Sequence, residues 1–311
     1  MNTPAVKRIK RRIDGVLLLN KPVGITSNTA LQIAKRLLQA EKAGHTGTLD
    51  PFADGLLPLC FGEATKFSQY QLEADKTYHA LLQLGVTTTT GDPEGEVLQT
   101  MPVNLSAQAI HTVVAGFVGD IMQTPPMYSA LKHQGKPLYE YARAGITIDR
   151  PARPVSIRAI SIDAIDLSAA TCTITVTCSA GTYIRTLAED IGNRLGCGAH
   201  LTRLTRLASG GFQLAQAVTL AQLEQDDMAT RDARLAAADG LVNYLPSILI
   251  DAPSAKLLMQ GQHPLFQGEI AQSGLLRAYY QQQFLGLVQV HADGKLIPQR
   301  LMSSRELLET I

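Results

Sequence analysis

Hydrophobic and polar residues alternate along residues 76–85 and 171–178, and this period of two predicts strands. In the second stretch threonine alternates with cysteine, isoleucine or valine, and in the first Tyr78 falls on the apolar face. Residues 154–166 are expected to form a further strand, and the apolar run at residues 15–20 predicts a buried one. One-sided alternation suits an antiparallel sheet with one covered face.

Apolar residues spaced by three and four predict helices between these strands. Residues 27–38 and 106–117 follow this spacing, and Ser27 is a candidate cap for the first helix. A third helix should begin near Thr182, its candidate cap, and end at Gly196. Its apolar stripe consists of Ile184, Leu187, Ala188, Ile191 and Leu195.

Three segments show neither period and are predicted to be loops, namely residues 43–55, 87–96 and 123–136. The first contains three glycines, one proline and two aspartates. Polar loops between regular elements commonly contain functional residues, so this segment is a candidate site.

The pattern changes towards the C-terminus. Residues 218–246 look helical and acidic, with Thr219 and Gln222 spaced as a capping box. Beyond them, three short strand-like runs separated by turns predict a small β-rich module: residues 275–280, 284–291 and 295–302. Strands and helices mix without regular βαβ alternation, so the fold class is predicted to be α+β, with a domain boundary near residue 247.

Composition narrows the class of protein. A chain of 311 residues with 45% hydrophobic side chains can form one large core and a small second domain. Its apolar runs are far shorter than the roughly 20 residues of a membrane-spanning helix, and no signal peptide is indicated, so we expect a cytoplasmic protein. The four cysteines lack CxxC spacing and the seven histidines form no HExxH motif, which argues against a zinc site.

The net charge of +1 is uninformative, but basic residues cluster locally. Clusters occur at residues 7–12, 132–136 and 143–158, and Arg203 and Arg206 form another. These clusters are candidates for phosphate contacts, and the alternative for each is an ordinary solvated face.

Two residues suggest chemistry. Asp50 precedes Pro51 in the first predicted loop, which restricts its backbone, although Asp-Pro is also a common turn. Arg185 falls in the first turn of its helix, where the macrodipole disfavours a cation, so a carboxylate should compensate it. That carboxylate could lie in a cleft, or it could be Glu189, one turn further along the helix. The inward-pointing Tyr78 could stack on a base or simply pack in the core.

Five motifs occur in order: VLLLNKPVG at residues 16–24, GHTGTLDPFADGLL at 44–57, KTY at 76–78, GTYIRTLA at 181–188 and GAHLTRLTR at 198–206. Together they closely resemble the TruB family of tRNA pseudouridine synthases, over about residues 13–250. Residues 248–305 more weakly resemble a PUA-like RNA-binding module.

The resemblance implies a pseudouridine synthase fold, with a mixed, mainly antiparallel sheet flanked by helices and a small β-rich PUA-like C-terminal domain. The implied organisation is a basic tail at residues 1–12, a catalytic domain at 13–247 and the PUA-like domain at 248–311. Within the catalytic domain, about residues 124–152 would form an insertion that clamps RNA.

The implied activity is isomerisation of the uridine at position 55, in the TΨC loop of tRNA, to pseudouridine. Asp50 would be the catalytic nucleophile, Arg185 would pair with it and keep it ionised, and Tyr78 would stack on the flipped uracil. Leu204 would form an apolar pocket wall. Attack on the ribose and attack on the base both remain open.

The resemblance also implies substrate contacts. His45 would stack inside the RNA loop, although an isolated loop histidine is usually unremarkable. Lys21 and Pro22 would support the pocket, the alternative being a strand end followed by a turn. Lys132 and Arg206 would contact phosphates. Many relatives have two consecutive arginines after the leucine where this chain has Thr205 and Arg206, which weakens one expected phosphate contact.

We expect no cofactor and no metal, since the isomerisation involves no redox change. The partner would be the TΨC arm of tRNA, bound by a monomer with no obligatory protein partner and no membrane. Two rival functions remain. A retaining glycosidase would need a second carboxylate about 5 Å from Asp50, for which Asp54 is the nearby candidate. A non-catalytic RNA-binding protein would use the basic clusters alone.

Overall fold

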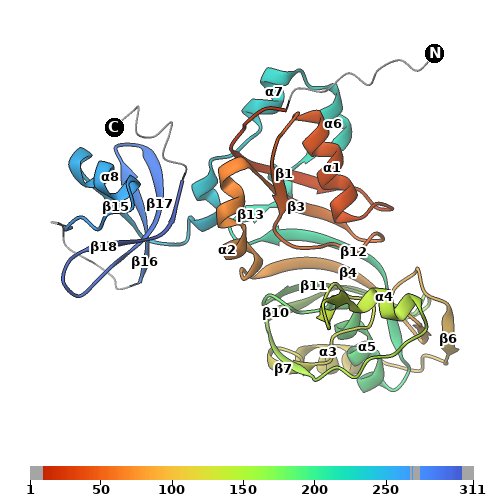
Figure 1. Ribbon diagram of the computed structural model, residues 1–311. Coiled ribbons are helices and arrows are strands. Elements are labelled where there is room, and N and C mark those ends of the chain that lie inside the picture. The colour runs from red at the N-terminus through yellow and green to blue at the C-terminus, as the bar shows by residue number, and fades with distance from the viewer. Residues whose placement is uncertain (1–9, 267, 269–273, 303–311) are drawn as a thin grey trace, which may run out of the picture.

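The structure is a computed structural model that describes residues 10–266, 268 and 274–302. Most of the predicted basic tail, and residues 303–311 of the predicted C-terminal domain, lie outside the described residues. The described part is α+β, as expected. It contains one large mixed sheet with helices packed on it and a separate four-stranded sheet near the C-terminus (Figure 1).

The large sheet has ten strands, and most neighbouring pairs are antiparallel; the pairs β1–β14 and β3–β12 are parallel. Its main path is β14 (Val218–Thr219), β1 (Gly15–Lys21), β3 (Asp54–Phe61), β12 (Ala199–Ser209), β4 (Lys76–Leu84), β11 (Thr171–Cys178), β10 (Arg153–Asp166) and β7 (Gly119–Gln123). Two short strands extend it, β2 (Ala43–His45) on β3 and β13 (Phe212–Gln213) on β12. The strands predicted from the sequence correspond to β1, β4, β10 and β11 and are confirmed.

The parallel pairing of β3 with β12 requires a glycine in β3. Gly55 has a φ of +100°, and a Cβ atom there would lie 2.4 Å from the carbonyl oxygen of Arg206. Only glycine tolerates this backbone conformation and this close approach. The step brings the strand that follows Asp50 directly beside the strand that contains Leu204.

The three predicted helices are confirmed as α1 (Ser27–Leu37), α3 (Ala107–Ala115) and α5 (Ile184–Leu195), and Gly196 ends α5 in the left-handed conformation. Two predicted caps are wrong. Thr26 caps α1, because Ser27 is buried and faces the interior. Thr182 does not cap α5, whose N-cap residue is Tyr183.

Three hydrophobic cores lie along the sheet. One packs α3 and α5 against β4, β10 and β11, and a second packs α1 and α6 (Leu220–Gln225) against β1 and β3. A third packs Phe67, Phe212 and Leu241 against the other face of β1 and β3. The predicted capping box of Thr219 and Gln222 is present at the start of α6. Leu49 and Phe52 pack in the first core, so the segment that contains Asp50 is fixed on both sides.

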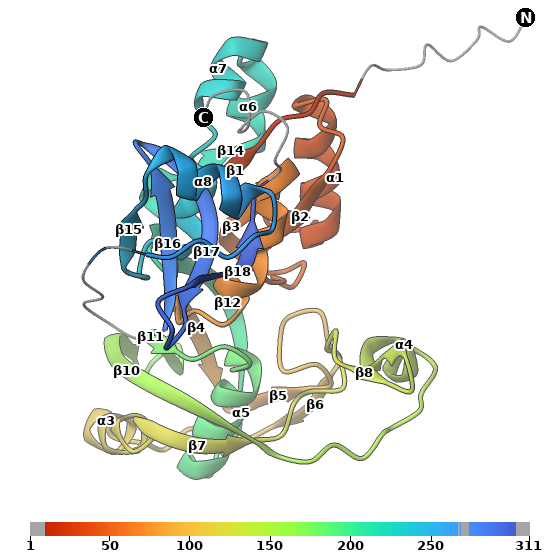
Figure 2. The same cartoon turned by 60° about the vertical axis from the view of Figure 1, so that its left-hand side comes forward.

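The predicted loops hold more regular structure than expected. Residues 43–55 begin with β2, and residues 87–96 begin within β5 (Val86–Thr88) and end just before β6 (Val97–Thr100). The residues after β7 form a hairpin, β8 (Lys132–His133) and β9 (Lys136–Pro137), followed by α4 (Leu138–Arg143). Gln123 and Arg153 are register partners, so residues 124–152 leave the sheet and return to the same point (Figure 2).

The C-terminal sheet contains the three strands predicted there, β16 (Leu275–Tyr280), β17 (Gln283–Val290) and β18 (Leu296–Leu301). A fourth strand, β15 (Ser247–Leu249), and helix α8 (Ala252–Met259) were not predicted. The sheet contacts the rest of the chain: the rings of Phe67 and Phe284 lie 5.2 Å apart, and Tyr279 donates a 2.6 Å hydrogen bond to Asp239.

The remaining helices are short. They are α2 (Ser68–Leu72), α7 (Met228–Ala233) and the 3-10 turns η1 (Gly62–Phe67), η2 (Leu214–Gln216) and η3 (Ala238–Val242). None of the helices in the described part of the chain has the length and apolar content to cross a membrane.

Candidate active site

The backbone around Asp50 is held by hydrogen bonds on both sides. Before it, the hydroxyl of Ser27 donates to the carbonyl of Leu49 (3.0 Å) and accepts from its N–H (2.8 Å). Because Ser27 is 1% exposed, this pair of bonds is shielded from water. The residue preceding Asp50 therefore has little freedom to rotate.

The carbonyl groups of Asp50 and Pro51 are also engaged. The N–H of Ala53 donates to Asp50 at 3.1 Å, and the N–H of Gly24 donates to Pro51 at 2.8 Å. Lys21 Nζ lies 3.5 Å from the Pro51 carbonyl. The predicted rigid turn is thus a hydrogen-bonded segment tied to the end of β1, and the carboxylate of Asp50 projects from it.

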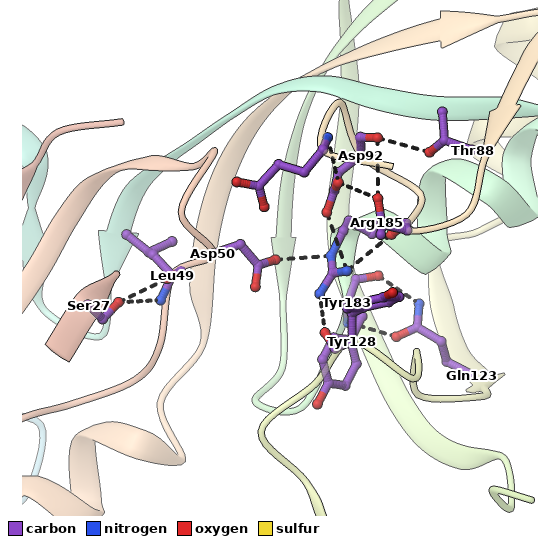
Figure 3. A network of polar contacts seen from close by, with 11 residues as sticks. Ser27, Leu49, Asp50, Thr88, Asp92, Gln123, Tyr128, Tyr183 and Arg185 are labelled. Carbon is purple, nitrogen blue, oxygen red and sulfur yellow. Dashed lines mark hydrogen bonds and ion pairs between the residues drawn. The ribbon is translucent and has the colours of Figure 1, made fainter. Parts of the chain in front are cut away.

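Arg185 meets this carboxylate. Its Nε lies 3.0 Å from Asp50 Oδ2, and its Nη1 lies 3.4 Å from Asp92 Oδ2 (Figure 3). The guanidinium also donates to the carbonyls of Thr90 (3.1 Å) and Tyr128 (2.7 Å). Only 4% of the arginine side chain is exposed, so four partners from three chain segments fix its plane.

The alternative partner of Arg185 is thereby decided. Within the described residues, its ion pairs are with Asp50 and Asp92 and not with Glu189. These two carboxylates compensate a cation at the start of α5. Asp92 was missed in the sequence, although it precedes Pro93 as Asp50 precedes Pro51, so the repeated Asp-Pro pair was an available signal.

Two cavities meet at the ion pair. The larger, about 1000 Å³, is lined by Asp50 and Arg185 together with His45, Asp92 and Tyr128, among others. The smaller, about 600 Å³, shares Asp50 and Arg185, and its other walls include Tyr78, Leu204 and Arg206. The structure therefore brings the three predicted catalytic residues to one place.

The register of the sheet explains how Tyr78 and Leu204 come together. β12 pairs with β4 so that Leu204 lies opposite Ala80 and Arg206 opposite Tyr78. Leu204 is buried and Tyr78 half-buried, and both line the smaller cavity. The predicted inward orientation of Tyr78 is confirmed, since it packs against the core beneath α5.

Burial shifts the ionisation of the site. Desolvation raises the pKa of the Asp50 carboxyl; the Arg185 guanidinium opposes this rise and the Asp92 carboxylate adds to it. Desolvation also raises the pKa of Tyr78, so its hydroxyl stays protonated and can donate a hydrogen bond. The site thus contains a carboxyl group with a raised pKa and a phenol that stays neutral.

Lys21 is fully buried at the end of β1, next to the segment that contains Asp50. Its Nζ donates to the carbonyls of Pro22 (2.8 Å) and Ile25 (2.7 Å), and burial lowers its pKa to about 8. Pro22 itself is exposed, and in the described part of the chain its ring lines neither cavity. It lies in the turn after β1, and its role as pocket support stays a prediction.

The two residues predicted to contact phosphates differ in their exposure to solvent. Arg206 is 1% exposed, and its guanidinium donates to the carbonyls of Leu56 (2.7 Å) and Gly47 (3.4 Å). Arg206 is therefore not a surface residue; it lines the smaller cavity, and its contact with a substrate phosphate stays a prediction. Lys132 is exposed on the β8–β9 hairpin, and among the described residues it is not part of either cavity wall. His45, half-buried at the end of β2, lines the larger cavity.

The chain matches three family models in succession. Residues 35–184 match "TruB family pseudouridylate synthase (N terminal domain)", residues 185–250 match "tRNA pseudouridylate synthase B C-terminal domain" and residues 246–302 match "Pseudouridine synthase II TruB, C-terminal". The chain belongs to the TruB family of pseudouridine synthases. Its catalytic class is therefore that of an isomerase.

Close TruB relatives span nearly the whole chain. The tRNA pseudouridine synthase B of Thiobacillus denitrificans is 59% identical over 300 residues, covering 96% of this chain and 99% of that protein. The protein of the same name from Methylobacillus flagellatus is 54% identical over 297 residues, covering 95% and 97%.

A similar fold is found in solved structures of H/ACA complexes. A chain of the archaeal box H/ACA sRNP Nop10–Cbf5 complex is 26% identical, with a TM-score of 0.70 over 94% of this chain and 87% of that one. A chain from an H/ACA RNP bound to a substrate RNA has the same TM-score at 24% identity and shows the fold alone.

The glycosidase alternative loses its support. Within the described residues, Asp54 lines neither cavity at Asp50. Asp92 also lines the larger cavity, but its carboxylate is engaged with Arg185 at 3.4 Å and is not a free acid.

Proposed function

We propose that the protein is a tRNA pseudouridine synthase that isomerises the uridine at position 55 in the TΨC loop, with Asp50 as the nucleophile. The observation that supports this best is the Asp50–Arg185 ion pair at the junction of the two cavities. A carboxylate held by a buried guanidinium and by a hydrogen-bonded turn is presented in one fixed orientation.

The proposed reaction rearranges bonds without redox change. Asp50 attacks either C1′ of the ribose or C6 of the base, and the N1–C1′ bond breaks. The uracil rotates, a bond forms between C5 and C1′, N1 gains a proton, and the proton on C5 is lost as the carboxylate is released. Atoms and electrons balance within the nucleotide, so no cofactor takes part.

The cavity walls suit a detached uracil. Leu204 offers an apolar surface and Tyr78 an aromatic ring on which the base could stack, and the protonated Tyr78 hydroxyl could donate to a carbonyl or ribose oxygen. The carbonyls of Asp50, Pro51 and Tyr128 already accept hydrogen bonds, from Ala53, Gly24 and Arg185 respectively.

A uridine inside a stacked loop must be extruded before Asp50 can reach it, at a cost of a few kcal/mol. His45 lines the larger cavity beside Asp50, where its ring could occupy the vacated stacking position. Burial lowers the pKa of His45, which favours the neutral ring that stacks well.

RNA binding would extend beyond the cavities. We propose that residues 124–152 clamp the TΨC arm, with Lys132 among the phosphate contacts, and that residues 248–311 contribute a PUA-like contact surface. The protein would act in the cytoplasm as a monomer, without an obligatory protein partner.

The direct test is to incubate the protein with an unmodified tRNA transcript and map pseudouridine at every site. We expect one product, at position 55. The Asp50→Asn variant should bind the transcript with wild-type affinity and form no product. Product formation by Asp50→Asn at the wild-type rate would remove Asp50 from the mechanism, and tight binding without any product in the wild-type protein would favour the non-catalytic RNA-binding alternative.

A further inference from the structure

Gln123 lies at the end of β7 and holds the start of α5. Its side-chain amide accepts a hydrogen bond from the N–H of Tyr183 (2.7 Å) and donates one to the Tyr183 carbonyl (3.1 Å) (Figure 3). A single side chain thus satisfies both backbone groups of one residue 60 positions away in sequence. Gln123 is 2% exposed, so water does not replace these bonds in the folded protein.

Tyr183 is the N-cap residue of α5, and in the described part of the chain the helix receives no side-chain cap from its own sequence. The first N–H groups of a helix lack intrahelical partners, and a helix end without a cap is prone to fray. Gln123 lies outside the helix and instead bonds both backbone groups of the N-cap residue, Tyr183. Arg185 lies two residues further on, within this first turn.

The same segment reaches Arg185 a second time. Residues 124–152 leave the sheet immediately after Gln123, and the Tyr128 carbonyl in this excursion accepts a 2.7 Å hydrogen bond from Arg185 Nη2. Residues 124–152 are therefore connected to Arg185 in two ways. Tyr128 bonds its guanidinium directly, and Gln123, at the base of the segment, bonds the backbone two residues before it.

We propose that Gln123 is a positioning residue for Arg185. By fixing the peptide groups of Tyr183, it sets where the guanidinium meets the carboxylate of Asp50, and it links this geometry to the base of residues 124–152. The inference rests on the proposed function for its catalytic consequence, but the placement of Arg185 can be measured independently.

The test replaces Gln123 by methionine, which keeps the length of the side chain and removes both hydrogen bonds. Gln83→Met is the matched control: Gln83 also donates to backbone carbonyls, those of Leu84, Ala169 and Ala170, at the far end of β4. Should Gln123→Met not fold, Gln123→Asn replaces it, because asparagine is one methylene too short to reach both groups of Tyr183.

The first readout is the single-turnover rate of pseudouridine formation with saturating enzyme. We expect a loss of about tenfold to a hundredfold in Gln123→Met, the range typical when a catalytic side chain loses its orientation. The affinity for tRNA and the rate of Gln83→Met should stay within about twofold of wild type. A wild-type rate in a folded Gln123 variant, or a rate loss explained by an equal loss of affinity, would overturn the inference.

The second readout does not require activity. NMR titration of Asp50 should show a higher pKa in Gln123→Met, because Arg185 opposes the rise caused by burial and a displaced guanidinium opposes it less. The other charges acting on Asp50, those of Asp92 and Lys21, remain in place. An unchanged titration contradicts the inference, whereas an inactive wild-type enzyme with a shifted titration contradicts only the proposed function.

Discussion

The hydroxyl of Ser27 and the peptide groups of Leu49 form a closed pair of hydrogen bonds, one donated at 3.0 Å and one accepted at 2.8 Å. Ser27 opens α1 and Leu49 immediately precedes Asp50. The first turn of a helix that follows β1 therefore fixes the backbone from which the candidate nucleophile projects.

Ser27→Ala should lower activity as well as stability. The change leaves a buried N–H and a buried carbonyl of Leu49 without partners, which costs about 1–3 kcal/mol each. Because small displacements of a reacting group are costly, we expect the single-turnover rate to fall about tenfold or more. Thermal unfolding and rate measurements on the same preparation check both effects.

Ser106→Ala is the matched control for Ser27→Ala. Ser106 caps α3 by accepting from the N–H of Ala109, far from the cavities, and its loss should cost about 1 kcal/mol of stability. Its rate should equal that of wild type. Equal rates for the two alanine variants at a temperature where both are folded would show that Ser27 does not orient Asp50.

Asp92→Asn should move the acid limb of the pH–rate profile. The rate falls as pH drops through the pKa of Asp50, because the nucleophile must be ionised, and this pKa is raised in the folded protein. Asp92 contributes to that rise, so its neutralisation should move the acid limb to lower pH, even as the rate at neutral pH falls through loss of a partner of Arg185.

The control for Asp92→Asn is Asp163→Asn, an exposed carboxylate on β10 that accepts from Thr175. Its acid limb should coincide with that of wild type. An acid limb that moves to higher pH in Asp92→Asn would mean that Asp92 acts on Asp50 mainly by holding Arg185 and not through its charge.

We expect Lys132→Ala, but not Arg206→Met, to change the salt dependence of tRNA binding. Each phosphate contact releases counterions, so Lys132→Ala should lower the slope of log K against log salt by about 1. Arg206→Met should leave that slope unchanged and destabilise the fold by about 2–3 kcal/mol, because buried carbonyls of Leu56 and Gly47 lose a charged donor. Binding titrations at several salt concentrations separate the two, and a reduced slope for Arg206→Met would show that Arg206 contacts a phosphate.

Much of the fold could be predicted from the local pattern, because a buried face places hydrophobic residues at regular intervals along its strand or helix. The alternation along β11 and the apolar stripe of α5 each identify a face that must be covered, and the structure covers both with the same core. The pairing of Arg185 with Asp50 was one of two open alternatives, because a helix position shows that a cation needs compensation but not which carboxylate is near.

The differences from prediction share a cause in tertiary contacts that local sequence does not encode. Ser27 looks like a cap, yet the neighbouring Thr26 takes that place and frees Ser27 for Leu49. Arg206 looks like part of a basic cluster, yet the β12 strand alternates so that it points inward. Gln123 gave no signal at all, since its partner is 60 residues away.

Residues 124–152 should respond to RNA in their hydrogen exchange. If they clamp RNA, their amides should be more protected from hydrogen exchange with tRNA bound than without it. The expectation has a structural reason: Gln123 and Arg153 pair at the base, whereas beyond it the excursion contains only the two-residue strands β8 and β9 and the short helix α4. Exchange should therefore slow most near Lys132 and least at the base. The strand β11 serves as the internal reference, because its amides are already bonded on both sides. Equal protection of residues 124–150 in the free and bound states would leave RNA binding to the rest of the surface and remove the clamp from the proposed function.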